Sequence, residues 1–174
     1  MKFFTVLWIT AFMLLLELIS GNMGLSPALP VFTAVYFAVA FAPEYGIASA
    51  GCAGILLDAA CNRAFPFAAI LFLAVTMLST HIALRSSRHS SLSAVGIGGI
   101  CGAMIYAGNL LYTVIGGTGF PGPDVFSMAV FQISGGALFL WLTVMLFDVI
   151  HHLCDLPCFV PSGKKSNLRG GNGR

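Results

Sequence analysis

The chain has 174 residues, of which 58% are hydrophobic and 8% are charged, and its formal net charge is +2 at pH 7. Soluble globular domains carry about 25% charged residues, so this composition excludes a soluble globular protein. A helix that crosses a membrane needs about 20 apolar residues, and apolar runs fill residues 1–153 almost completely. The sequence therefore predicts one all-α, polytopic membrane domain with no room for a soluble catalytic module. The small net charge gives no indication of nucleic-acid binding.

Turn residues divide the apolar sequence into six predicted membrane-spanning helices. The expected spans are residues 3–20, 27–42, 46–61, 64–84, 92–115 and 125–150. The second is short for a bilayer, and Pro66 is expected in the first turn of the fourth. Glu17 interrupts the first run, which is therefore interpreted as a span and not as a cleaved signal peptide. Residues 154–174 form a basic, Gly-rich tail that we expect to be disordered.

The positions of the cations predict the orientation in the membrane. With six spans, both termini lie on one side, and that side receives seven Lys and Arg residues, whereas the other side receives only Arg63. This asymmetry predicts that both termini are cytoplasmic. The seven cations are Lys2, Arg85, Arg88, Lys164, Lys165, Arg169 and Arg174.

Small residues recur at helical spacing in the third and fifth predicted spans. In the third span the series of small residues is followed, at the same spacing, by the acid Asp58. Residues four positions apart lie on the same face of a helix. Small residues let two backbones approach closely, which is how membrane helices associate. Two interpretations remain open, packing within the chain and docking of a helix from another protein. The residues concerned are Gly46, Ala50, Gly54, Asp58, Gly98 and Gly102.

Three charged residues are expected near the external ends of the first and third spans, namely Glu17, Asp58 and Arg63. A carboxylate in a spanning helix costs about 2.5–3.5 kcal/mol on insertion scales, so it needs a partner or a wet site. The main expectation is an external polar cluster that ties the outer helix ends together by ion pairs and hydrogen bonds. A proton relay, or contact with a ligand or partner, is the alternative.

Two further polar groups are candidates for interaction. Asn109 and Gln132 are expected at similar depth in antiparallel spans, where they would form an amide–amide hydrogen bond. The sequence His151-His152-x-Cys154-Asp155-x-x-Cys158 contains residue types that bind zinc, but its spacing matches no zinc motif. Polar termination of the sixth span is the favoured interpretation.

The sequence contains no phosphate-binding loop, no His-Glu-x-x-His and no Gly-x-Ser-x-Gly. We therefore expect a protein that is not an enzyme, with no catalytic residues, no metal and no cofactor.

The segment from Gly46 to about Ala74 resembles the central signature of the MreD rod-shape-determining family. That family has a Gly-rich third span that ends in Gly-x-x-x-Asp, followed by a turn and an apolar helix, and Gly54 and Asp58 occupy those places here. This sequence departs from the family at the turn, where it has Asn62-Arg63 and no glycine, and in its extended tail.

The resemblance implies a membrane scaffold of the bacterial cell-elongation machinery in the bacterial cytoplasmic membrane. Its implied partners are the single-span protein MreC, the MreB cytoskeleton and the peptidoglycan synthases. The alternative is a substrate-capture subunit of an energy-coupling-factor vitamin transporter, a class with six spans and a similar general shape. In that case Glu17, Asp58, Arg63 and Asp124 would form an external polar pocket.

Overall fold

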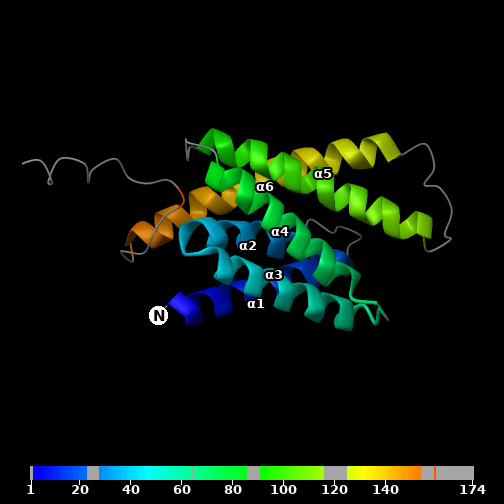
Figure 1. Ribbon diagram of the computed structural model, residues 1–174, viewed down its shortest axis with the longest axis horizontal. Helices are drawn as coiled ribbons and strands as arrows, with labels where there is room; N and C mark the ends of the chain where they lie inside the picture. Colours follow the sequence, from blue (N-terminus) through cyan, green and yellow to red (C-terminus); the bar gives the residue numbers. More distant parts are fainter. Residues whose placement is uncertain are drawn as a thin grey trace, which may run out of the picture.

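A computed structural model describes residues 2–22, 28–63, 65–85, 91–115, 125–153 and 159 (Figure 1). These ranges contain six α-helices and no β-strand, so the prediction of an all-α fold with six helices is confirmed. The helices are α1 Lys2–Asn22, α2 Leu29–Ala40, α3 Pro43–Ala60, α4 Phe67–Arg85, α5 Ser91–Ile115 and α6 Val125–Leu153.

Two helix starts differ by three residues from the predicted ones, and both of these differences involve proline. Helix α3 begins at Pro43, three residues before the predicted start, because the fixed φ of proline suits the first helical position. Helix α4 begins at Phe67, so Pro66 precedes the helix and does not lie inside its first turn.

Four of the helices are long and apolar enough to cross a membrane: α1, α4, α5 and α6. Helix α2 has 12 residues, a length of about 18 Å, whereas the hydrocarbon core of a bilayer is about 30 Å thick. Helix α3 has 18 residues, but its glycines, serine and two acids make it less apolar. The fold is therefore that of a multi-pass membrane protein.

Helix α2 is the central element of the molecule. It packs against α1, α3, α4 and α6, and ten of its twelve residues are buried. Its apolar residues are thus covered by protein, which explains how a run too short for a bilayer can be apolar on every face.

Helices α5 and α6 form a long antiparallel pair beside the other four helices (Figure 1). Glycines permit their close contact, because a Cβ atom added at Gly98 would lie 2.5 Å from the carbonyl oxygen of Gly136. One turn further along, an added Cβ at Gly102 would lie 3.1 Å from Cα of Ile133. This is the close approach typical of small residues in membrane helices.

The expected pairing of Asn109 with Gln132 is wrong. The glycine contacts place Gly102 opposite Gln132, so Asn109 lies seven residues, or about 10 Å, further along α5, and it is exposed. The prediction assumed that the loop joining the helices is symmetric, but backbone contact between glycines sets the register instead.

The N-terminus and the end of α6 lie at the same end of the molecule (Figure 1). The ends of α1 and α3 lie at the opposite end, together with the starts of α2 and α4. We call these the terminal end and the Asp58 end.

Candidate functional site

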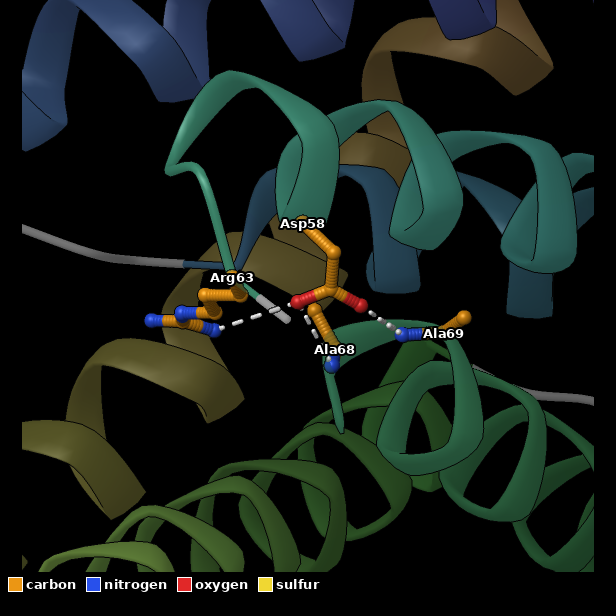
Figure 2. A network of polar contacts seen from close by, with 4 residues as sticks. All are labelled: Asp58, Arg63, Ala68 and Ala69. Atoms are coloured by element: carbon orange, nitrogen blue, oxygen red, sulfur yellow. Dashed lines mark hydrogen bonds and ion pairs between the residues drawn. The ribbon is translucent and has the colours of Figure 1, made fainter. Parts of the chain in front are cut away.

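The side chain of Asp58, near the end of α3, binds the start of α4 (Figure 2). Its Oδ1 atom accepts a hydrogen bond from the backbone N–H of Ala68 at 3.1 Å, and its Oδ2 atom accepts one from Ala69 at 3.0 Å. Asp58 is 4% exposed. The first N–H groups of a helix have no partner within that helix, and its positive dipole end favours an anion, so this carboxylate satisfies both requirements of α4.

Arg63 completes this arrangement from the turn between the two helices. Its Nη1 atom lies 3.5 Å from Oδ1 of Asp58, and its guanidinium carbon lies 5.3 Å from the ring centre of Tyr112 in α5. Asn62 adopts a left-handed conformation, with φ of 50°, which turns the chain back so that Arg63 N–H donates to the carbonyl of Asp58. The Arg63 side chain is 31% exposed, so the ion pair adds less than the backbone bonds.

Gly54 makes the Asp58 contact possible. A Cβ atom at this position would lie 2.7 Å from the backbone nitrogen of Ala69 and 3.0 Å from the carbonyl carbon of Ala68. These are the residues whose N–H groups Asp58 binds, one turn further along α3. The motif Gly54-x-x-x-Asp58 therefore combines one residue that lets α4 approach with one that holds the first turn of α4 in place.

Glu17 performs the same task for α2 and is 3% exposed. Its Oε1 atom accepts from the N–H of Ala28 at 3.1 Å, and its Oε2 atom accepts from Leu29 at 2.9 Å. The predicted cluster of three charged residues is thus divided, because Asp58 pairs with Arg63 while Glu17 binds a different helix start. Backbone amides supply the partners that these two carboxylates need.

The small-residue face of α3 is occupied by helices of this chain. Its members Gly46, Ala50 and Gly54 are all buried. A Cβ atom at Gly46 would lie 2.9 Å from Cα of Ala38 in α2, and Gly54 faces α4 as described. In α5, Gly98 and Gly102 face α6 in the same way. No room remains on these two faces for a helix from another protein.

A second polar cluster, in which Asp148 is half-buried, lies at the terminal end and joins α2 to α6. The phenol of Tyr36 donates to Oδ1 of Asp148 at 2.8 Å and lies 2.9 Å from Nδ1 of His151. Because a phenol has one proton, Nδ1–H of His151 is then the donor to the Tyr36 oxygen. Tyr36 and His151 are fully buried, at 0% exposure.

Phe159 extends this cluster beyond the end of α6. Its backbone N–H donates to Oδ1 of Asp148 at 2.7 Å, and its ring stacks on Tyr36 with centres 6.2 Å apart. The side chain is 1% exposed. Phe159 belongs to the predicted tail and was not predicted as a site residue; the remaining residues of that tail lie outside the described ranges.

A spacing in the sequence could have indicated this contact. Asp58 binds the amide of Ala68, and Pro66 lies between these two residues in the sequence. In the same way, Asp148 binds the amide of Phe159, and Pro157 lies between them. In both cases an acid binds an amide ten or eleven residues later, two positions after a proline.

The metal hypothesis gains no support from the residues that can be tested. Within the described ranges, no group of three His, Cys, Asp or Glu side chains could hold a metal ion. Cys154, Asp155 and Cys158 lie outside these ranges, and His151 binds Tyr36.

Comparisons with protein-family models, curated proteins and solved structures gave no match. The fold and the two polar clusters define an all-helical, multi-pass membrane protein in which buried carboxylates hold the starts of helices.

Proposed function

We propose that this chain is a non-enzymatic scaffold of the bacterial cell-elongation machinery. In this proposal it crosses the bacterial cytoplasmic membrane six times, has both termini in the cytoplasm and docks a single-span, MreC-like protein. That partner connects it to the MreB cytoskeleton and the peptidoglycan synthases.

The observation that carries the proposal is the geometry of the Gly54-x-x-x-Asp58 motif. This motif is the most specific part of the resemblance to the MreD family, and both of its residues act on the start of α4. A motif that fixes the angle between two helices suits a protein whose task is to present a rigid surface to a partner.

A partner helix would have to use an outward face of α3, because the inward face is filled by α2 and α4. Four exposed residues of α3 follow one another at intervals of four, three and four, which places them on one side of the helix. Three of the four are small, and small residues permit the close contact on which helix association in membranes depends. These residues are Ala48, Cys52, Ile55 and Ala59.

Co-purification with the candidate single-span partner tests this proposal. The double substitution Ala48→Leu and Ala59→Leu should abolish co-purification while the protein still inserts into the membrane. The control is Ala107→Leu, which enlarges an exposed small residue on α5 and should leave co-purification unchanged. Equal recovery of the partner with both variants would refute the proposed face, and no recovery with the unmodified chain would refute the scaffold. Gly54→Leu is unsuitable, because it would separate α3 from α4.

Vitamin capture is the weaker candidate. It requires Glu17 and Asp58 to face a ligand, but both are almost fully buried and accept hydrogen bonds from backbone amides. Asp124, the fourth residue of the expected pocket, lies outside the described ranges. A vitamin retained in native mass spectra of the purified protein would favour this candidate over the scaffold.

A further inference from the structure

A cavity of about 200 Å³ lies between the first turns of α3 and the last turns of α4, at the terminal end of the molecule. A water molecule occupies about 30 Å³ of liquid, so the cavity can hold a group of several heavy atoms. The lining residues are Pro43, Ile47, Met77, Thr80, His81 and Leu84.

The cavity opens toward the outside of the helical bundle. Met77 is 57% exposed and Leu84 is 54% exposed, and both belong to α4, one of the helices long enough to cross a membrane. In a bilayer these side chains face lipid. The natural occupant of the cavity is therefore a molecule that approaches from the bilayer.

Thr80 lines the cavity and is 6% exposed, but its hydroxyl oxygen is almost completely covered by the protein. A ligand in the cavity therefore meets the apolar part of this side chain, and the polar contacts must come from other residues.

Two basic side chains accompany Thr80. His81 lines the cavity, and Arg85 follows it by four residues, which places both on the same face of α4; both are exposed. An arginine in the last turn of a spanning helix lies at the level of the lipid headgroups. Phosphate oxygens are acceptors that match both of these donors.

The two helix ends beside the cavity have opposite effects on an anion. The C-terminal end of α4 carries a partial negative charge, but the N-terminal end of α3 carries a partial positive one and has no side-chain cap at Ala42. Glu44 is the acid in this first turn, and it points about 100° around the helix from Pro43, which lines the cavity. The preference of the cavity for an anionic ligand therefore depends on the side chains of His81 and Arg85.

We propose that this cavity binds the phosphate of an anionic phospholipid from the surrounding bilayer. His81 and Arg85 donate hydrogen bonds to the phosphate, and the apolar wall formed by Ile47 and Met77 holds the upper part of an acyl chain. The site is independent of the proposed partner-docking face, which lies on other residues of α3.

Native mass spectrometry of the full-length protein, titrated with defined lipids, tests this site. Phosphatidylglycerol should be retained, whereas diacylglycerol with the same acyl chains and free glycerol phosphate should not. The first comparison tests phosphate recognition, and the second tests whether the ligand comes from the bilayer. Equal binding of phosphatidylglycerol and diacylglycerol, or equally tight binding of free glycerol phosphate, would overturn the proposal.

Variants locate the site on α4. The double substitution His81→Gln and Arg85→Gln should weaken phosphatidylglycerol binding at least about fivefold, since each basic residue near a headgroup contributes about that factor. The control His152→Gln removes an exposed histidine from the same end and should have no effect. Unchanged binding in the double variant of α4 would refute the assignment.

Discussion

The carboxylate of Asp58 in α3 accepts a hydrogen bond from the backbone N–H of Ala69 in α4 at 3.0 Å. The contact joins two helices through a side chain on one and a main-chain group on the other. Its geometry requires that the helices nearly touch, and Gly54 provides that approach. Glu17 makes the equivalent contact with Leu29 of α2 at 2.9 Å. A hydrogen bond from a backbone N–H at a helix start to a carboxylate therefore occurs twice at the Asp58 end.

Replacing Asp58 by Asn should lower the free energy of unfolding by about 2 kcal/mol. A carboxamide offers one acceptor oxygen to two backbone amides, and it carries no charge to match the dipole of α4 or Arg63. Thermal unfolding in detergent measures the change. The control Glu44→Gln removes the same charge from the exposed first turn of α3, where the expected loss is about 0.5 kcal/mol or less. Equal losses in the two variants would contradict the capping role.

Replacing Gly54 by Ala should lower the free energy of unfolding by about 1–3 kcal/mol, because the new Cβ atom overlaps the backbone of α4. The control is Gly51→Ala on the same helix, where an added Cβ would lie 3.6 Å from the Leu73 side chain, an ordinary contact. This control should be neutral or slightly stabilising, since Ala favours helices over Gly. The double variant with Asp58→Asn should lose less than the sum of the single losses, because both residues act on Ala69. Additive losses would contradict the joint role.

Ser79 and Cys101 provide a direct test of how α4 lies against α5. Their Oγ and Sγ atoms are 3.0 Å apart, and both residues are buried. Ser79→Cys, in a chain whose other four cysteines are replaced by Ala, should form a disulfide with Cys101 on oxidation, detected by mass spectrometry of the digested protein. Ser134→Cys on the exposed side of α6 is the control and should remain unpaired within the chain. A crosslink in the control, or none in the test variant, would contradict this packing.

Replacing Tyr36 by Phe should destabilise the protein by about 1–3 kcal/mol. The phenol is a hydrogen-bond partner of both Asp148 and His151, and its removal leaves the buried His151 and the half-buried Asp148 with one contact fewer. The control Tyr112→Phe retains the ring that faces Arg63 and loses only a hydroxyl from a 42% exposed side chain. A shift in the unfolding midpoint of the control as large as that of the test variant would argue against the Tyr36 cluster.

The apolar runs and turn residues were sufficient to predict all six helices, because segment length and hydrophobicity are local properties. The boundaries near Pro43 and Pro66 were less accurate, since proline can begin a helix or precede it. The shortness of α2 was visible in the sequence. Its central position was not, because that depends on contacts with four other helices.

The polar sites were predicted in part, for a physical reason. The ion pair between Asp58 and Arg63 joins residues five positions apart, and sequence spacing indicated it. The backbone amides that bind Asp58 belong to the next helix, and residue types do not indicate such contacts because nearly every residue has a backbone amide. Tyr36 and Asp148 are separated by 112 residues, so only the packing of α2 against α6 brings them together.

In the proposed arrangement, α4 crosses the membrane with the Asp58 end outside the cell. Cys61 precedes this helix and Arg85 is its last residue, and both are exposed. In chains whose other cysteines are replaced, a membrane-impermeant maleimide should label Cys61 in intact cells, whereas Arg85→Cys should be labelled only after the membrane is permeabilised. Labelling of both positions from the same side would contradict the crossing, and labelling of Arg85→Cys alone in intact cells would contradict the orientation.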